Sequence, residues 1–233
     1  MRLACAAAVD RNLGRQAVVA ALSGKRRIFG CLYWWYMKRI GLTGNIGSGK
    51  TTVCKVFEML DIPVYDADKE ARGFLYRADV VAKLRRLFGG DILDAEGKPD
   101  REALAGLVFQ NPGELKKLNA LIHPLVRQDY EAWAAKQTHA PYTIQESAIL
   151  FESGQYKVFD KTILVMAPRQ VRIERVCKRD GATARSVEDR MRNQADQQEL
   201  QSLADLVIHN DGKLLVIPQI LRIHHELGGE HFQ

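Results

Sequence analysis

The chain has 233 residues, of which 46% are apolar, and this suffices for one well-buried domain with a small subdomain inserted into it. The net charge of +6 lies almost entirely in residues 1–36, since the remainder has 28 basic and 27 acidic residues. A nearly neutral body lacks the basic face that would release counterions from a duplex, which excludes a nucleic-acid partner. No stretch of about 18 apolar residues occurs, which excludes a membrane-spanning helix.

The 36 residues before Met37 differ in composition from the rest of the chain. They are rich in arginine and poor in acids, which suits a transit peptide, but Ser23 is their only serine. Met37 directly precedes the first convincing strand. We therefore expect residues 1–36 to be a basic extension, disordered or with a start that is not native, and residues 37–233 to form the folded core.

Cysteine usage favours a cytoplasmic protein with reduced thiols. The four cysteines lie far apart in the sequence and form no C-x-x-C pair; they are Cys5, Cys31, Cys54 and Cys177. Disulfide frameworks and zinc sites need closer or paired spacings, so neither is predicted.

From Met37 onward the sequence alternates between short apolar strands and helices. Strands are predicted at 39–43, 62–65, 142–146, 161–166 and 205–209, with a helix over 51–60 after the first of them. This alternation predicts an α/β fold with a five-stranded parallel sheet covered by helices on both faces. Ligands of such sheets bind at the carboxyl ends of the strands, and Asp66 stands at the carboxyl end of the second strand.

Two segments between the strands are predicted to be helical. Within about 71–138 we expect helices around Leu87, after Asp100 as N-cap, over 112–122, and from Pro124, because proline suits a first helical turn. This insert is where a second substrate could be bound. The densely charged segment 168–201 is also predicted to be helical, and Pro218 should kink or delay a final helix over 213–227.

The clearest motif is GNIGSGKT, which occupies 44–51 and fits the phosphate-loop pattern G-x-x-x-x-G-K-[ST] in full. Its glycines permit the tight curl that lets several backbone N–H groups converge on one phosphate, and the following helix directs its positive end at the anion. Lys50 would reach the β- and γ-phosphates, and Thr51 would coordinate Mg²⁺. The alternative is a structural glycine turn, which a strand before the loop and a helix after it disfavour.

Two further features favour kinase chemistry on a small molecule. The carboxylate of Asp66, beside the loop, could accept the proton of an attacking hydroxyl; the alternative is an N-cap for a helix beginning near Ala67, which we favour for Asp68. A cationic cluster on one helix could neutralise a triphosphate, or it could be a solvated face; its members are Arg172, Arg175, Lys178 and Arg179.

Six segments stand in one order along the chain: GLTGNIGSGKTT at 41–52, VYDAD at 64–68, LNALIHPLV at 118–126, ILFESG at 149–154, RVCKRD at 175–180 and ADLVIHNDG at 204–212. In this order and spacing they resemble the dephospho-coenzyme A kinase family. The resemblance covers 37 to about 227 and implies a P-loop NTPase three-layer fold with a helical acceptor-binding insert and a helical lid over about 175–200. It also implies ATP-dependent phosphorylation of the ribose 3′-hydroxyl of dephospho-coenzyme A, the last step of coenzyme A synthesis.

Carried over to this sequence, the resemblance implies a set of site residues. Asp66 is similar to the family's general base, and Arg175 and Arg179 to its lid residues. Asn210 is similar to part of the adenine pocket, and the acceptor site is implied at His123, Phe151 and Glu152. With Lys50 these give the expected catalytic residues. The nucleotide-binding set is expected to comprise Asn45, Ile46, Gly47, Ser48, Gly49, Lys50, Thr51, Thr52 and Asn210.

Two of these assignments carry reservations from the residues themselves. His123 precedes a proline that suits the start of a helix, so the alternative to its acceptor-site role is to cap that helix. Residues 148–150, Ala-Ile-Leu, stand where the family usually has Pro-Leu-Leu, which changes backbone stiffness near Phe151 and Glu152 rather than their chemistry.

Two other functions stay open. One is a different P-loop nucleoside or nucleotide kinase with another acceptor. The other is a non-catalytic nucleotide-binding switch, for which an N-K-x-D motif is expected; the nearest segment, NDGK at 210–213, has the wrong order. We expect a cytoplasmic monomer that uses ATP and Mg²⁺, acts on the small molecule dephospho-coenzyme A, and binds neither nucleic acid nor membrane.

Overall fold

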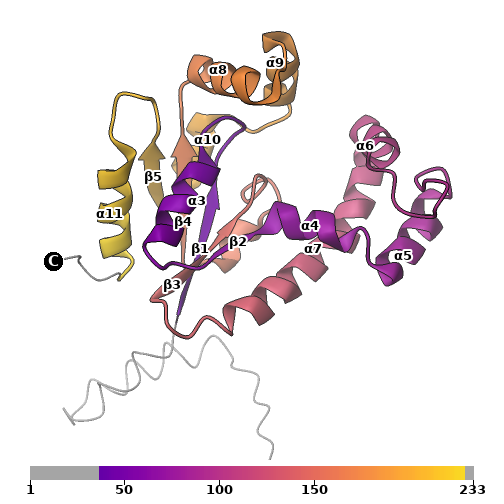
Figure 1. Ribbon diagram of the computed structural model, residues 1–233, viewed down its shortest axis with the longest axis horizontal. Helices are drawn as coiled ribbons and strands as arrows, with labels where there is room; N and C mark the ends of the chain where they lie inside the picture. The colour runs from indigo at the N-terminus through magenta and orange to yellow at the C-terminus, as the bar shows by residue number, and fades with distance from the viewer. Residues whose placement is uncertain (1–36, 229–233) are drawn as a thin grey trace, which may run out of the picture. The chain divides into compact units, whose positions relative to one another are not determined.

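The structure is a computed structural model that describes residues 37–228, which belong to one compact unit beginning at Met37 (Figure 1). The predictions for residues 1–36 lie outside the described residues. Within 37–228, every helix is too short or too polar to cross a bilayer.

Five parallel strands form one sheet in the order β2-β3-β1-β4-β5. Their bounds are β1 Lys38–Thr43, β2 Val64–Asp66, β3 Tyr142–Glu146, β4 Lys161–Met166 and β5 Leu206–His209. The predicted sheet is confirmed, with ends shifted by at most two residues. Because all strands run the same way, their carboxyl ends meet at one edge, and the register there pairs Asp66 with Glu146.

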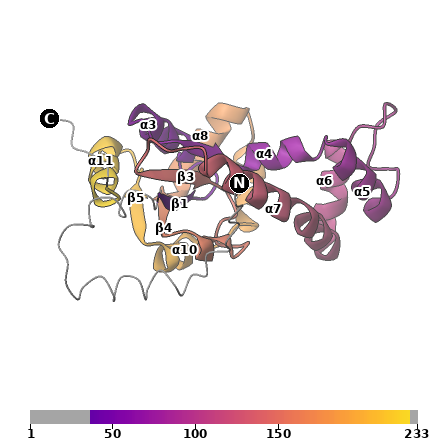
Figure 2. The same ribbon diagram turned by 90° about the horizontal axis from the view of Figure 1, so that it is seen from below.

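Helices cover both faces of the sheet, giving three layers. On one face lie α3 (Lys50–Met59) and α11 (Val216–Glu226), whose buried residues Phe57 and Ile220 join Ile40 and Leu42 of β1 in the largest core cluster. On the other face α10 (Gln197–Leu203) packs Leu200 against Leu164 of β4. Figure 2 shows α3 and α10 on opposite sides of the strands.

The segment between β2 and β3 contains helices and no strand of the sheet, as predicted. Its elements are α4 Ala67–Phe74, α5 Ala78–Phe88, α6 Arg101–Gln110 and α7 Pro112–Ala134, and the connection from α5 to α6 contains a short turn over 93–99. The N-cap predicted at Asp100 is present, since its carboxylate accepts from Glu102 N at 2.9 Å. In Figure 1, α5 and α6 extend away from the sheet while α7 returns to it.

The prediction that a helix begins at Pro124 is wrong. Pro124 lies inside α7, which runs unbroken from Pro112 to Ala134. Proline removes one N–H from a helix, but the carbonyl that loses its partner is that of Ala120, which is exposed and can bind water. A buried stripe at i, i+4 spacing, from Ile122 through Val126 to Tyr130, stabilises the helix across the proline.

The charged segment after β4 forms α8 (Arg169–Asp180) and α9 (Ala184–Arg192), followed by α10. In Figure 1, α8 and α9 lie beyond the carboxyl ends of the strands, next to the loop between β1 and α3. A short 3-10 helix, Gln155–Val158, precedes β4. Pro218 delays the last helix as predicted, because α11 begins at Val216 and proline is tolerated in a first turn.

A buried polar pair joins the sheet to α11. The hydroxyl of Tyr142, which is fully buried in β3, lies 2.7 Å from Nδ1 of His224, a residue with only 6% of its surface exposed. Burial, with a smaller contribution from His225, lowers the pKa of His224 below its usual 6.5. The folded protein therefore favours the neutral imidazole at this position.

This pair predicts acid sensitivity of the fold. Because the unfolded chain binds a proton at His224 more readily than the folded one, stability should be fully present above pH 6.5 and fall below it, by up to about 1.4 kcal/mol per pH unit. His123, whose pKa burial also lowers, acts in the same direction. Urea unfolding of wild type and His224→Gln between pH 8 and 5 measures the effect; equal slopes for both would contradict it.

Candidate functional site

The phosphate loop, residues 44–49, connects β1 to α3, and glycine is required at positions 47 and 49. Gly47 and Gly49 have φ of 77° and 96°, in the left-handed region that L-residues with side chains disfavour. Both also lie against other segments. A Cβ on Gly47 would stand 2.6 Å from the carbonyl oxygen of Arg172, and one on Gly49 would collide with the side-chain amide of Asn210. The glycine spacing seen in the sequence is therefore required by both backbone shape and packing.

Donor groups face the inside of this loop. No side chain among residues 37–228 caps α3, so the N–H groups of Lys50 and Thr51, ahead of those that donate to the Gly49 carbonyl, are available to a ligand. The carbonyl of Ser48 points outward, since Asn210 Nδ2 donates to it at 2.8 Å. A trans peptide directs its N–H opposite to its carbonyl, so this bond turns the Gly49 N–H inward. The loop can thus surround an anion with amides at the positive end of a helix.

Lys50 begins α3, and its ammonium group lies inside the site. Nζ donates to the carbonyl of Gly44 at 2.8 Å and stands 4.0 Å from the carboxylate of Glu146. The next two residues, Thr51 and Thr52, are exposed in the first turn of α3. Lys50 is therefore placed between the loop and the strand edge that carries the acids.

Three carboxylates gather across from the loop at the ends of β2 and β3. Asp66 ends β2 and caps α4, because its Oδ1 accepts from Lys69 N at 2.8 Å. Asp68, for which the sequence favoured this capping role, instead accepts from the backbone N of Ala148 at 3.2 Å, and that prediction is wrong. Glu146 is the register partner of Asp66 on β3. The structure thus brings Asp66, Asp68 and Glu146 together with Lys50.

Burial shifts the protonation of two of these acids. The pKa of Glu146 is raised chiefly by burial, while Lys50 lowers it and Asp66 raises it further. The pKa of Asp68 is likewise raised by burial, against the bond from Ala148. The protonation of Glu146 and Asp68 therefore responds to any cation or hydrogen-bond donor that binds nearby, because a positive neighbour stabilises the charged form of a carboxylate.

Oxygen donors beside the loop could also contribute to binding a divalent cation. Thr51, the exposed residue after Lys50, carries a hydroxyl, and the carboxylate of Glu146 stands 4.0 Å from Lys50 Nζ. Hydroxyl and carboxylate oxygens are ligands that Mg²⁺ accepts. No group of three or more His, Cys, Asp or Glu within 37–228 is arranged to hold a metal by itself. A metal here would therefore share its coordination sphere with a substrate and water.

The side chains of Arg175 and Asn210 donate hydrogen bonds to carbonyl groups at the outer edge of the loop. Nη1 of Arg175 donates to the carbonyl of Asn210 at 3.0 Å and, at 3.4 Å and 3.5 Å, to those of Ser48 and Gly47. Its Nη2 donates to Oδ1 of Asn210 at 3.1 Å. Both side chains thus bond to protein groups, and they connect α8 and the end of β5 to the loop.

Arg179 lies one turn further along α8 and is exposed. It pairs with Asp180 at 2.6 Å, and Arg190 of α9 reaches the same carboxylate at 3.4 Å. These bonds raise the pKa of Arg179 and lower that of Asp180. Of the two arginines that the resemblance places in the lid, Arg179 thus remains at the surface, while Arg175 is bound to the loop.

The residues between α9 and α10 also form hydrogen bonds with the phosphate loop. Oε1 of Gln194 accepts from the backbone N of Ile46 at 2.9 Å, and Nδ2 of Asn45 donates to the carbonyl of Ala195 at 2.9 Å. The side chain of Ile46 packs against the core between α8 and α9, which includes Val176. Ser48 is fully buried. Of the predicted nucleotide-binding residues, Asn45, Ile46 and Ser48 therefore have their side chains in protein contacts.

His123 lies inside α7 and is half-buried, so the capping alternative considered for it is wrong. Contacts of the two following turns of α7 show toward which edge of the sheet His123 lies. One turn after His123, the carbonyl of Val126 lies 3.5 Å from the hydroxyl of Tyr65 in β2. Tyr130, a further turn on, bonds Thr143 near the start of β3, so α7 runs opposite to the strands. His123 therefore lies toward the same carboxyl edge as Asp66.

Phe151 and Glu152, the other predicted acceptor contacts, differ in environment. Phe151 is 6% exposed and packs on Tyr156, with ring centroids 5.2 Å apart, in the cluster beneath α10. Glu152 is exposed. The packing gives Phe151 a structural role, and contact of either residue with an acceptor stays a prediction.

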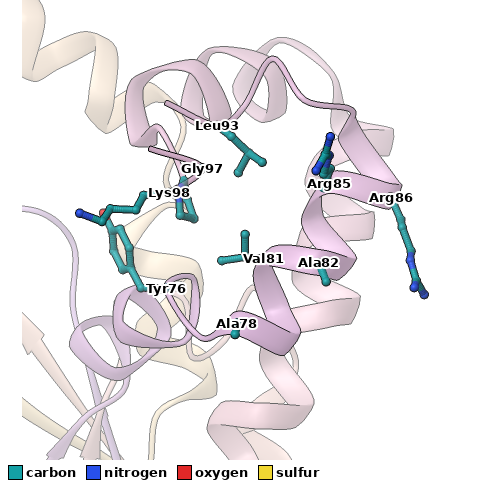
Figure 3. A pocket seen from close by; sticks show the side chains of 10 residues that line it. Tyr76, Ala78, Val81, Ala82, Arg85, Arg86, Leu93, Gly97 and Lys98 are labelled. Atoms are coloured by element: carbon teal, nitrogen blue, oxygen red, sulfur yellow. The ribbon is translucent and has the colours of Figure 1, made fainter. Parts of the chain in front are cut away.

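An open cavity of about 750 Å³ lies in the insert, between α5 and the turn over 93–99 (Figure 3). Its wall includes the apolar side chains of Val81 and Leu93 and the ring of Tyr76. Arg85 and Arg86 of α5 also line it (Figure 3). The insert thus offers an apolar surface with a cation beside it.

Sequence reasoning missed two of the acids at the site. Glu146 was predicted as the last residue of a strand but given no role, and Asp68 was assigned to capping. A signal was present for Glu146, because a carboxylate that ends a central parallel strand must lie at the ligand-binding edge. Its proximity to Lys50 depends on the order of the strands, which the sequence left open.

Comparison with known proteins gives consistent matches over the described region. A family model described as dephospho-CoA kinase matches residues 38–215. The dephospho-CoA kinase of Aquifex aeolicus is 38% identical over 193 residues, covering 82% of this chain and 98% of that protein. The crystal structure of TT1252 from Thermus thermophilus matches with a TM-score of 0.75 and 36% identity, covering 83% and 100%. Dephospho-CoA kinase from Campylobacter jejuni, at 23% identity and a TM-score of 0.60, shares the fold over 82% and 98% of the two chains.

The loop geometry predicts a sharp difference between two glycine substitutions. Gly49→Ala should weaken ATP binding at least about 10-fold, because the added Cβ strains a left-handed residue and displaces Asn210. Gly106→Ala in α6 is the control, since nothing lies within 4 Å of its Cβ position and alanine favours helices. Isothermal titration calorimetry measures both. Unchanged affinity in a folded Gly49→Ala protein would contradict the packing argument.

Proposed function

This chain belongs to the dephospho-CoA kinase family, and we propose that it transfers the γ-phosphoryl group of ATP to the ribose 3′-hydroxyl of dephospho-CoA, giving ADP and coenzyme A. The observation that carries the proposal is the joint position of the loop and the acids. Lys50 and Glu146 lie 4.0 Å apart, and Glu146 is beside Asp66 at the same sheet edge. A phosphate donor and an alcohol acceptor would therefore meet there.

The nucleotide is bound through its phosphates by the inward amides of the loop and by Lys50. On binding, the Lys50 ammonium group exchanges the Gly44 carbonyl for phosphate oxygens, a stronger bond because both partners are charged. Positive charge near the γ-phosphoryl group stabilises the charge that spreads over its oxygens during transfer.

Thr51 and Glu146 are the residues that would hold Mg²⁺ with the nucleotide. The fit rests on their chemistry, a hydroxyl on the residue after Lys50 and a carboxylate 4.0 Å from Lys50 Nζ, and on the small number of protein ligands that Mg²⁺ needs beside phosphate oxygens and water. When bound, the metal supplies charge neutralisation on the phosphates.

Asp66 acts as the general base. The bond from Lys69 N to its Oδ1 fixes the carboxylate at the end of β2, and its other oxygen accepts the proton of the 3′-hydroxyl. The hydroxyl oxygen forms a bond to the γ-phosphorus as the bond from that phosphorus to the β,γ-bridging oxygen breaks. The proton then leaves Asp66 for solvent, which restores the carboxylate.

The two lid arginines have different roles in this proposal. Arg175 is a positioning residue, because its donors bond the carbonyls of the loop and of Asn210 and so maintain the inward amides. Asn210 supports the same arrangement through Ser48 and thereby borders the nucleotide. Arg179, exposed at the end of α8, is free to approach the phosphates by exchanging Asp180 for them.

The insert binds the rest of the acceptor. Dephospho-CoA carries a pyrophosphate and a long, mostly uncharged arm, and the cavity between α5 and the turn over 93–99 has apolar walls with Arg85 beside them. His123 faces the end of the insert nearest the sheet edge and contacts the acceptor closer to the reacting hydroxyl. Cytoplasmic location and a monomeric state remain predictions.

Substituting the base gives the first test of this mechanism. Asp66→Asn should lower kcat by about 100-fold or more while leaving ATP affinity nearly unchanged, because the amide cannot accept the proton. Asp79→Asn is the matched control, an exposed aspartate of the insert paired with Arg77. Steady-state kinetics and calorimetry measure the two effects. Normal turnover in Asp66→Asn would remove Asp66 from the mechanism.

A panel of acceptors tests the substrate. ADP release should be fastest with dephospho-CoA and much slower with AMP, CMP or deoxynucleosides, because only the former offers a pyrophosphate and arm to the insert. The full chain and a chain beginning at Met37 should give equal rates, since every residue of the proposed site lies after Met37. A preference for a nucleoside monophosphate would replace the proposed acceptor, and no ADP release with any acceptor would favour a non-catalytic nucleotide-binding protein.

A further inference from the structure

Arg72 on α4 is a cation that the proposed mechanism does not use. Its side chain is exposed, and its guanidinium forms no ion pair or hydrogen bond within the part of the chain that the structure describes. Arg77, the next arginine along the chain, is instead bonded to Asp79 through two nitrogens, each at 3.0 Å. Arginine presents five donors in a planar fork that suits carboxylate and phosphate. The donors of Arg72 are therefore available to a ligand.

The face of α4 that carries Arg72 is directed at the end of β3. Asp68 and Arg72 are four residues apart and so share one face of the helix. The carboxylate of Asp68 accepts from the backbone N of Ala148 at 3.2 Å, just beyond the end of β3. Ala67 and Ala71, on the adjacent face, belong to the core that α4 shares with α7. Arg72 thus lies on the side of α4 that faces the carboxyl edge of the sheet.

The charge of Arg72 acts on the acids of the site. Burial raises the pKa of Asp68 and Glu146, and the cations that lower it are Lys50 and, to a smaller extent, Arg72. Lys50 is 4.0 Å from Glu146 and is assigned to the nucleotide. Arg72 forms no ion pair with either acid among residues 37–228, so its fork is not bound by them. It adds a second positive charge to this edge, on the side of α4.

The proposed acceptor carries an anion close to its reacting hydroxyl. In dephospho-CoA the pyrophosphate is joined through C5′ to the same ribose whose 3′-hydroxyl reacts, so one sugar ring separates the two groups. Asp66 caps α4, and Arg72 follows six residues later, which is about 9 Å along a helix axis. The long side chain of Arg72 spans part of that interval. Its guanidinium can therefore contact the pyrophosphate while Asp66 contacts the hydroxyl.

The elements after Asp66 stand in the same order as the groups of this acceptor. α4 begins after Asp66 and carries Arg72, and the cavity of Figure 3 follows directly, with Tyr76 and Val81 in its wall. In the acceptor, the ribose is followed by the pyrophosphate and then by the mostly uncharged arm. With the hydroxyl at Asp66, the pyrophosphate at Arg72 and the arm in the cavity, each group meets a surface of matching chemistry.

We propose that Arg72 binds the pyrophosphate of the acceptor and thereby selects dephospho-CoA over acceptors that lack this group. The inference rests on the proposed function, because it concerns the acceptor named there. Arg85 also borders the cavity, but it lies on α5, further along the chain from the reacting hydroxyl. Bidentate bonds from a guanidinium to phosphate oxygens are stronger than neutral hydrogen bonds and orient the group they bind. Arg72 accordingly positions the ribose with its 3′-hydroxyl toward Asp66.

Steady-state kinetics with the full chain test the proposal. Arg72→Met removes the charge and keeps an unbranched side chain that suits a helix. It should raise KM for dephospho-CoA at least about 10-fold, as expected for loss of a hydrogen bond to a charged group, with the dissociation constant of ATP unchanged. Arg127→Met is the matched control, an exposed arginine of α7 that is paired with Glu131. A KM within twofold of wild type in a folded Arg72→Met protein would overturn the proposal.

A second acceptor separates binding of the pyrophosphate from an indirect effect on the acids. Adenosine has the same 3′-hydroxyl but no pyrophosphate, so ADP release with adenosine should be equally fast in wild type and Arg72→Met. The preference for dephospho-CoA over adenosine in kcat/KM should then fall at least about 10-fold in the variant. If Arg72 only neutralises Asp68 and Glu146, both acceptors should lose activity in proportion. An unchanged preference would therefore contradict the proposal.

The pyrophosphate can also be observed directly. In ³¹P NMR spectra of dephospho-CoA bound to excess protein, its pyrophosphate resonances should differ between wild type and Arg72→Met. Arg72→Lys covers the case in which the methionine variant does not fold, because it keeps the charge but loses the bidentate geometry and should also shift these resonances. Resonances identical to those of wild type would overturn the proposal.

The wild-type protein distinguishes this inference from the proposed function. If wild type releases no ADP with dephospho-CoA, the proposed function and the inference fail together. If wild type phosphorylates dephospho-CoA and Arg72→Met does so with the same KM, the inference alone fails.

Discussion

Hydrogen bonds from Arg175 and Asn210 to the carbonyls of the phosphate loop are the constraint on which the rest of the site depends. The outward carbonyl of Ser48 turns the N–H of Gly49 inward, so two side chains from α8 and the end of β5 direct this donor toward a bound phosphate. Glycine at 49 is needed for the same reason, since a larger residue would displace Asn210. The loop sequence provides the flexibility to curl, and its neighbours select one conformation.

Cationic donors and carboxylates meet at this edge of the sheet. Amides and Lys50 lie on the side of the loop, the carboxylates of Asp66, Asp68 and Glu146 lie on the side of β2 and β3, and Lys50 stands 4.0 Å from Glu146. Burial raises the pKa of Glu146 and Asp68 more than the nearby Lys50 lowers it. A phosphate donor suits the first side, and an alcohol that must lose a proton suits the second.

The insert and the lid connect this edge to the surface in different ways. α7 is anchored to the sheet by buried aromatic residues, with Tyr65 and Tyr130 at a ring distance of 5.4 Å, and it extends the same apolar core outward to α5 and α6. α8 and α9 have a smaller core of their own, into which Ile46 of the loop packs. The lid is therefore coupled to the phosphate loop by side-chain contact, whereas the insert is coupled to Asp66 through β2 and α4.

The sequence alone determined the five strands, the phosphate loop, the helical insert and the position of Asp66 at a strand end, because apolar periodicity and glycine spacing are local properties. Local rules failed where tertiary contacts outweighed them: a buried stripe continues α7 through Pro124, and Asp66 rather than Asp68 caps α4. Only the tertiary structure decided that Glu146 meets Lys50, and that Arg175 holds the loop while Arg179 stays exposed. These facts depend on strand order and helix orientation, which bring Arg175 to Gly47 across 128 positions, and no pattern within one segment encodes that proximity.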